Sequence, residues 1–278
     1  MTKLFLIFTL IISMLNPAAG QPVHTAGLKA ILVVGHQEDG TARAVTEMDK
    51  IARLFNDHGV TVEKFYDRKA IWKEVVKASA DANFFVYSGH GTTLGGQNRS
   101  GGLCVEPTVS ALTMQAELKL AGHALVVFQS VCMGAGSSAG DESDIGPEEA
   151  EKRVGDYAYP FFSCGAAAYY ATNYIGGALE FLSGFLNGDA LGDGYKRSAS
   201  GWTEIEFEKS YDRDPVKSIS VASRPGGGTT TLITYTNGKR STRQIPVVKG
   251  YNIAYVGEPG FSVKSMKAES TIKSLVRK

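Results

Sequence analysis

The sequence has almost no net charge: 29 lysines and arginines face 28 aspartates and glutamates, which leaves a formal charge of +1. Without a charge excess, neither nucleic acid nor an anionic membrane surface is expected as a partner. After residue 20, no apolar run approaches the roughly 18 residues that a transmembrane helix needs. The composition, 43% hydrophobic over 278 residues, is instead typical of one large globular domain, with or without an extension.

Cysteine is scarce, and its odd count limits disulfide formation. Of the three cysteines, Cys104, Cys132 and Cys164, at least one must stay free or pair with another molecule. A free Cys132 fits a nucleophile. Cys104 and Cys164 either pair or are small buried apolar residues, and the second interpretation is favoured. No His/Cys spacing resembles a zinc site, and no phosphate-binding loop is present, so no cofactor is expected.

The first 20 residues form a separate unit. Lys3 supplies a positive start, residues 4–15 are almost continuously apolar, and Pro17-Ala18-Ala19-Gly20 provides small residues for cleavage. This pattern predicts a signal peptide, with an uncleaved anchor as the alternative. A secreted or periplasmic protein is therefore expected, with no stable membrane insertion after signal removal.

Apolar runs and helical patterns alternate after the signal. Residues 28–34, 60–66 and 83–87 are typical of strands, whereas residues 42–58 and 71–80 have helical spacing. This βαβαβ order predicts an α/β sandwich with a largely parallel central sheet. Right-handed crossovers then place the carboxyl ends of the strands on one edge, where ligands bind.

After the signal, the chain divides into three predicted parts. The α/β core is predicted over residues 21–200, and a β-rich extension with a closing strand over residues 201–260. Within the extension, Asn237-Gly238 between β-formers indicates a hairpin. Residues 261–278 are expected to be a polar surface tail. Further predicted elements are helices at 109–120, 148–163 and 177–186 and strands at 166–173 and 251–256.

Two predicted strands each lead into a small-residue turn that carries a reactive side chain. One strand runs into Ser88-Gly89-His90-Gly91, and the other into Ser130-Val131-Cys132-Met133-Gly134. A cysteine attacks as its thiolate, and a neighbouring imidazole can take the thiol proton and later return it to a leaving group. The pair therefore predicts a thiol nucleophile and its base on one edge of the sheet.

These turns resemble those of a known superfamily. Residues 85–91, Phe-Val-Tyr-Ser-Gly-His-Gly, are similar to the histidine strand of caspases, metacaspases, gingipains and CHAT-type peptidases, and residues 128–134 to their cysteine strand. Residues 161–188 are similar to the region after the cysteine, and residues 254–259 to the closing strand. The resemblance implies a caspase-like three-layer sandwich and an exported cysteine endopeptidase that acts on protein or peptide substrates.

The resemblance also implies roles for single residues. His90 would be the base and acid, and Cys132 the nucleophile that forms a thioester. Backbone N–H groups of Gly91 and Cys132 would form the oxyanion hole.

The residue preference is not inherited from the superfamily. Metacaspases have an acidic residue two positions before the cysteine, where this chain has Ser130. His36, Ser130, Asp141 and Asp144 are the candidates for a substrate pocket. Asp141, Glu142 and Asp144 would supply negative charge there, bind calcium, or simply be solvated.

Two alternatives to an active peptidase remain open. In the first, the chain would be a catalytically silent caspase-like module that uses its β extension for partner contact. In the second, it would be a different α/β enzyme in which the two motifs occur together by chance. A silent module predicts a blocked or absent pocket, whereas an unrelated enzyme predicts strand ends that do not converge. The sequence leaves the oligomeric state open.

Overall fold

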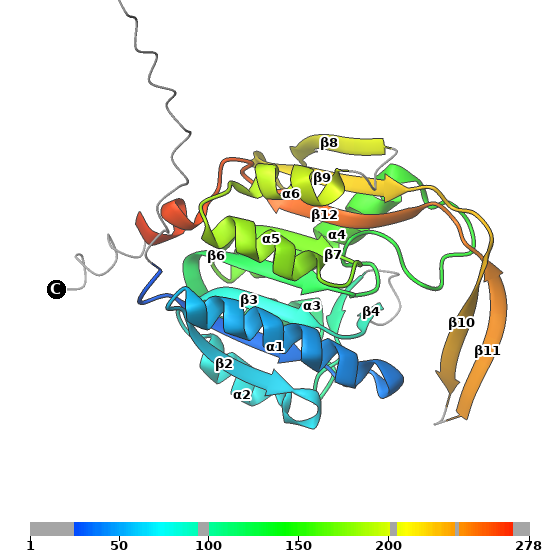
Figure 1. Ribbon diagram of the computed structural model, residues 1–278, viewed down its shortest axis with the longest axis horizontal. Helices are drawn as coiled ribbons and strands as arrows, with labels where there is room; N and C mark the ends of the chain where they lie inside the picture. Colours follow the sequence, from blue (N-terminus) through cyan, green and yellow to red (C-terminus); the bar gives the residue numbers. More distant parts are fainter. Residues whose placement is uncertain (1–24, 94–99, 201–204, 237–238, 269–278) are drawn as a thin grey trace, which may run out of the picture.

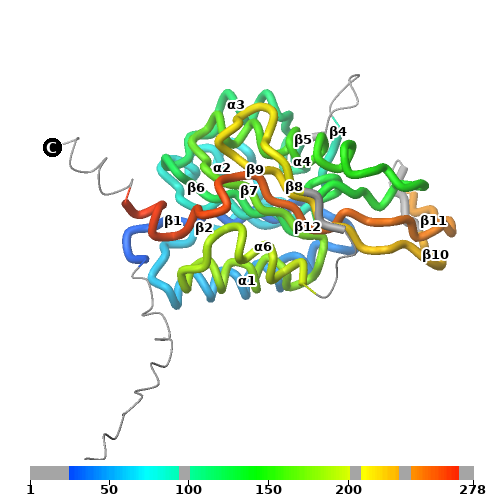
Figure 2. The backbone as a smooth tube through the Cα atoms, turned by 90° about the horizontal axis from the view of Figure 1, so that it is seen from above, coloured from blue at the N-terminus to red at the C-terminus, as the bar shows by residue number. Residues whose placement is uncertain are grey.

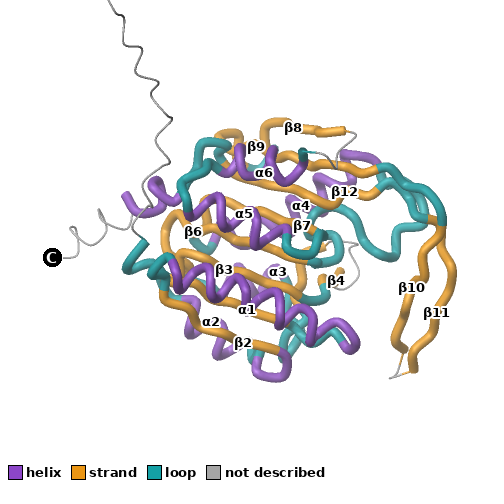
Figure 3. Tube along the Cα trace, viewed as in Figure 1, coloured by secondary structure: helices purple, strands orange, loops and turns teal. Residues whose placement is uncertain are grey.

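The protein is described from a computed structural model, which covers residues 25–93, 100–200, 205–236 and 239–268. An eight-stranded sheet forms its centre, as Figure 1 and Figure 3 show. Five neighbouring strands are parallel, and three antiparallel strands continue the sheet. The strand order is β2 (Thr61–Tyr66), β1 (Lys29–Val34), β3 (Ala82–Ser88), β6 (Leu120–Gln129), β7 (Ala166–Thr172), β12 (Gly250–Gly257), β9 (Asp214–Arg224) and β8 (Ile205–Tyr211).

Helices cover both faces of this sheet, which Figure 2 shows from above. One layer contains α1 (Thr41–Asp57), α5 (Gly177–Leu186) and α6 (Leu191–Ala199). The opposite layer contains α2 (Trp72–Ser79), α3 (Ala111–Glu117) and α4 (Gly146–Ser163). The predicted α/β sandwich with a mostly parallel sheet is therefore confirmed.

The strand β3 shows why continuous apolar runs form the middle of the sheet. All seven of its residues are buried. Phe84 and Val86 pack in the core on the α1 side, whereas Phe85 and Tyr87 pack on the α4 side. A parallel strand covered on both faces cannot alternate apolar with polar residues, because neither face meets water.

The region after residue 200 contributes to two structures. Strands β8, β9 and β12 extend the central sheet, so much of the predicted β-rich extension belongs to the main body. Strands β10 (Thr229–Thr236) and β11 (Lys239–Pro246) form an antiparallel hairpin that projects at the right of Figure 1. Thr236 pairs with Lys239, which confirms the predicted hairpin; its turn residues lie outside the described part.

Two expectations differ from the structure, and one helix was not expected. The predicted polar tail is wrong over its first residues, because Phe261, Val263 and Met266 are buried against the α5 side of the sheet. Their apolar side chains outweigh the basic composition around them. The helix expected at 109–120 is α3 and ends at Glu117, since β6 already begins at Leu120. Helix α6 was not predicted.

The amino-terminal expectation cannot be followed in the structure. Residues 1–20, assigned to a signal peptide, lie outside the described residues. Among the residues that are described, no helix combines the length and the apolar character needed to cross a bilayer.

Candidate functional site

The two reactive side chains leave neighbouring strands at the same edge of the sheet. Strands β3 and β6 are parallel partners, and Ser88 pairs with Gln129 at their carboxyl ends. The chain then turns into the segment with His90 and into the segment with Cys132. These segments touch: a methyl group placed on Gly91 would lie 2.4 Å from the carbonyl oxygen of Cys132. The two turns therefore meet through their backbones, at Gly91 and Cys132.

A buried tyrosine holds the histidine turn. The Tyr87 hydroxyl donates a hydrogen bond to the His90 carbonyl oxygen at 2.8 Å, and the amide of Cys104 donates to the same oxygen at 3.2 Å. The turn passes directly over this ring, since a methyl group on Gly89 would lie 2.3 Å from the Tyr87 hydroxyl oxygen. Burial raises the pKa of Tyr87 well above its usual value, so the hydroxyl stays a donor.

The imidazole of His90 meets a carboxylate that the sequence did not single out. His90 Nε2 lies 3.1 Å from Oε2 of Glu38, and both side chains are partly exposed. Glu38 begins a short 3-10 helix, Glu38–Gly40, after β1, and thus comes from the same edge of the sheet. Its place after the first predicted strand was the only signal that could have identified it. A carboxylate in this position orients the ring and stabilises an imidazolium.

His36 follows the same strand but has a different neighbour. Its Nδ1 lies 2.6 Å from Oδ1 of Asp67, and both groups are exposed. This hydrogen bond lowers the pKa of Asp67. His36 is not among the residues that line the pocket at Cys132.

The cysteine loop is held by hydrogen bonds on both sides of Cys132. Gly134 donates its amide to the Val131 carbonyl at 2.9 Å, and the buried Tyr169 hydroxyl donates to the Gly134 carbonyl at 2.8 Å. The half-buried Cys132 differs, because its own amide donates no hydrogen bond to any residue that the structure describes. An amide without a partner in a fixed loop is suited to bind an oxyanion.

The other two cysteines are separate free thiols. Cys164 is buried, and its Sγ lies 3.0 Å from the Pro160 carbonyl oxygen, to which it donates. Burial raises the pKa of Cys164 to about 11. Cys104 is half-buried rather than fully buried, and burial is also the main cause of its raised pKa. No disulfide therefore joins Cys104 to Cys164 in this structure.

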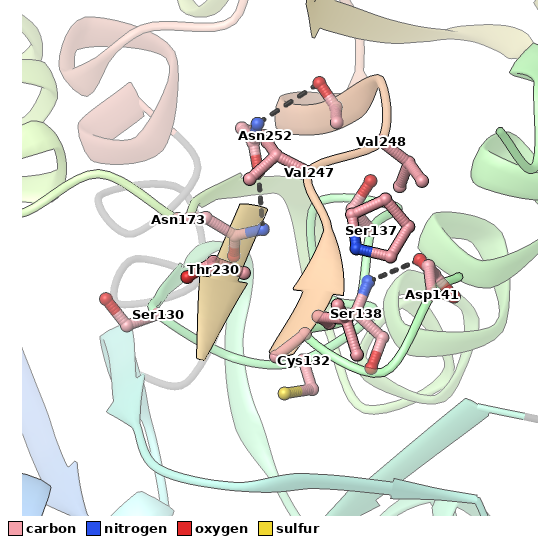
Figure 4. Close-up of a pocket in the computed structure, with 14 residues that line it drawn as sticks. Ser130, Cys132, Ser137, Ser138, Asp141, Asn173, Thr230, Val247, Val248 and Asn252 are labelled. Carbon is pink, nitrogen blue, oxygen red and sulfur yellow. Dashed lines mark hydrogen bonds between the residues drawn. The ribbon is translucent and has the colours of Figure 1, made fainter. Parts of the chain in front are cut away.

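A pocket of about 370 Å³ lies beside Cys132. In Figure 4, Cys132 is at its margin, with Ser130 on one side and Ser138 and Asp141 on the other. One wall comes from the loop after β6, through Ser130, Cys132, Ser137, Ser138, Ala139 and Asp141. The hairpin supplies another wall through Thr230, Ile245 and Pro246, together with Val247 and Val248, which follow it. Asn173, Gly250 and Asn252 complete the lining.

The hairpin residues are the largest group that sequence reasoning missed. They lie about 100 positions after Cys132 in the chain, and the β extension was considered only as a contact surface for partners. The structure instead brings the base of the hairpin to the candidate nucleophile.

Two of the four predicted pocket residues line this pocket, and two do not. Ser130 and Asp141 do. Asp144 accepts the Gly146 amide at 3.0 Å at the start of α4 and is not in the lining; His36 is absent from it as described above.

The acidic residues of the loop have separate partners. Asp141 contacts Arg153 at 2.9 Å, and Glu142 contacts Arg243. Arg243 lowers the pKa of Glu142 through this hydrogen bond. In the described part of the chain, no group of three His, Cys, Asp or Glu residues is placed to hold a metal ion. The arrangement gives the calcium interpretation no support.

No protein-family model matches this sequence, and no match to a curated protein was found.

Proposed function

We propose that this protein is an exported cysteine endopeptidase of the caspase-like type, with Cys132 as nucleophile and His90 as base. One observation carries the proposal: the His90–Gly91 turn lies against Cys132 at the carboxyl edge of two neighbouring parallel strands. This is the edge at which α/β proteins bind ligands. The resemblance of both turns to the superfamily motifs supports the same chemistry.

The reaction follows from the roles of these groups. His90 accepts the thiol proton of Cys132, and the thiolate attacks the carbonyl carbon of the substrate. A C–S bond forms, and the amides of Cys132 and Gly91 stabilise the oxyanion. His90 then gives its proton to the leaving amine as the C–N bond breaks. Water, deprotonated by His90, hydrolyses the thioester and regenerates the thiol.

Two features of the structure fit these steps. The Cys132 amide is without a partner among the described residues, and one oxyanion donor contributes on the order of 3 kcal/mol to stabilising the transition state. The Glu38 carboxylate stabilises the imidazolium that forms at His90 during the first step.

The silent binding module is the alternative, and the pocket argues against it. Such a module predicts a pocket that is blocked or absent. A pocket of about 370 Å³ instead includes Cys132 in its lining. Space beside the nucleophile favours an enzyme that admits a substrate side chain.

The decisive experiment is cleavage of a mixed peptide library, compared between the wild-type protein and Cys132→Ala. We expect cleavage to fall by more than about 100-fold in this variant, together with loss of the earliest iodoacetamide labelling at neutral pH. Cys164→Ala is the matched control, because it removes a buried thiol away from the pocket and should retain cleavage. Cleavage that persists in Cys132→Ala would overturn the proposal.

A further inference from the structure

Among the residues that the structure describes, Asp141 is the one carboxylate that lines the pocket beside Cys132. Asp141 projects from the loop after β6, and apart from the thiol of Cys132 the other lining residues are uncharged. A free carboxylate here would attract a substrate lysine or arginine. Whether the pocket is acidic therefore depends on what else contacts Asp141.

Arg153 neutralises this carboxylate. Its Nη1 lies 2.9 Å from both oxygens of Asp141, and the Ser138 amide donates to Oδ2 at 2.7 Å. The side chains are only 10% exposed for Asp141 and 16% for Arg153. Partial burial strengthens the ion pair and limits screening by salt, so the carboxylate is not available as a separate charge.

Arg153 is itself fixed in place. From α4, its Nε donates to Oε1 of Glu149 at 3.1 Å, and its Nη1 also donates to the Gly136 carbonyl at 3.2 Å. The arginine therefore joins α4 to the loop that carries Cys132. A substrate cation would have to replace a guanidinium held by several acceptors, whereas a substrate carboxylate would meet the carboxylate of Asp141.

Glu149 shares Arg153 with Asp141, but it also contacts Lys152 at 3.3 Å, so the two acidic and two basic side chains of this group balance. Other charged side chains of this region have contacts of their own outside the lining. Glu142 contacts Arg243, Asp144 accepts the Gly146 amide, and the Lys249 ammonium lies 5.8 Å from the centre of the Tyr251 ring. Apart from Asp141, none of these charged groups is in the lining.

The remaining surface suits a neutral side chain. The lining includes hydroxyl and amide groups, among which Asn173 Nδ2 donates to Asn252 Oδ1 at 3.1 Å (Figure 4). It also includes four apolar residues, Ile245, Pro246, Val247 and Val248. A side chain with an apolar stem and no charge can contact both kinds of group without leaving a buried ion unpaired.

We propose that this pocket receives an uncharged side chain of the substrate, at the residue before the cleaved bond, and that Arg153 determines this specificity by neutralising Asp141. The inference rests on the proposed peptidase function and adds its substrate class. Arg153 acts through Asp141 and is a positioning residue. Peptides with neutral residues at that place, such as glutamine or leucine, are the expected substrates.

The test is a charge cycle over Asp141 and Arg153, measured as ratios of kcat/KM for peptides that differ only in the residue before the cleaved bond. We expect the wild-type enzyme to prefer glutamine or leucine over arginine and glutamate by at least about tenfold. Arg153→Gln should raise the arginine-to-glutamine ratio about tenfold, because Asp141 is released. Asp141→Asn should raise the glutamate-to-glutamine ratio, and the double variant should return both ratios toward wild type.

The outcomes separate this inference from the proposed function. If no peptide is cleaved in a Cys132-dependent manner, the peptidase proposal fails. If cleavage depends on Cys132 but prefers arginine or glutamate, or if neither single variant changes the ratios, the specificity inference alone is wrong. Circular dichroism checks folding, and if Arg153→Gln is unfolded, Asp141→Asn tests the same charge balance in the opposite direction.

Discussion

The backbone of Gly91 lies directly against the carbonyl oxygen of Cys132. A methyl group at position 91 would be 2.4 Å from that oxygen and 2.2 Å from the Tyr157 hydroxyl oxygen. Neither distance is possible for a real carbon atom, so only glycine allows the two turns to meet. The close approach that unites the candidate site also makes it sensitive to a single methyl group.

The variant Gly91→Ala tests this approach. We expect a loss of peptidase activity of more than about 100-fold and destabilisation by about 2 kcal/mol, because the added methyl group must displace the cysteine loop. Gly260→Ala is the control, since no atom lies within 4 Å of the added carbon there. Peptide cleavage and urea unfolding measure both effects. If Gly91→Ala kept the wild-type kcat/KM, the close approach of Gly91 to Cys132 would not matter for activity, and the prediction would be wrong.

Tyr87 is expected to position the histidine turn. Tyr87→Phe removes the donor to the His90 carbonyl and should cost about 1 kcal/mol of stability and about tenfold in kcat. Tyr195→Phe is matched to it, because that buried hydroxyl accepts a hydrogen bond from Ser220 on the opposite side of the sheet. Both variants should lose similar stability in urea unfolding, but only Tyr87→Phe should lose activity. Equal activity in the two would refute the positioning role.

Glu38 is expected to contribute to catalysis through His90. Glu38→Gln keeps the shape of the side chain but removes its charge, so it should lower kcat about fivefold and leave KM nearly unchanged. The neighbouring Asp39 lies 3.9 Å from Arg240. Asp39→Asn therefore controls for local charge and should stay within about twofold of wild type. Steady-state kinetics measure kcat and KM separately, and a change in KM alone in Glu38→Gln would argue against this role.

The thiols should react in a defined order. At neutral pH, iodoacetamide should label Cys132 before Cys104 and Cys164, because burial raises the pKa of both other thiols and so reduces their thiolate fraction. For Cys164 in the folded protein, labelling should become rapid only as the pH approaches about 11. Mass spectrometry of the labelled peptides measures the order, and urea should abolish the differences. Early labelling of Cys164 in the folded protein would contradict its burial.

The raised pKa of Cys164 also predicts that the folded protein loses stability at high pH. The folded protein keeps the Cys164 proton up to about pH 11, whereas an unfolded thiol loses it near its ordinary value of 9.0. Between these values the unfolded state binds fewer protons, so the free energy of unfolding falls as the pH rises. Cys164→Ala should weaken this dependence in urea unfolding at pH 8 to 10.

Local patterns were sufficient for most of the sheet and its helices. The continuous apolar run of β3 and the helical spacing of α1 are readable in the sequence. A strand buried on both faces is apolar throughout, whereas a helix buried on one stripe repeats its apolar residues every three to four positions. The Asn237-Gly238 turn likewise indicated the β10–β11 hairpin. Helix α6 was missed because its sequence, with glycines at 192 and 194, has weak helical propensity and is stabilised by burial of Leu191 and Tyr195.

The sequence was sufficient to predict which strand ends meet, but not what surrounds them. His90 and Cys132 could be named because each follows a predicted strand, and parallel strands end on a common edge. By contrast, nothing local links Glu38 to His90, Arg153 to Asp141, or Val247 to Cys132. The residues of each pair come from different elements, and the packing of those elements decides which side chains come together.

The sequence by itself determined the layered α/β architecture and the delivery of a thiol and an imidazole to one edge, since both follow from short-range periodicity and the rules of parallel sheets. Only the tertiary structure decided that Asp141 is neutralised by Arg153 and that the hairpin closes one wall of the pocket. The charge and the shape of the pocket depend on distances between residues that are far apart in the chain, and only folding sets those distances.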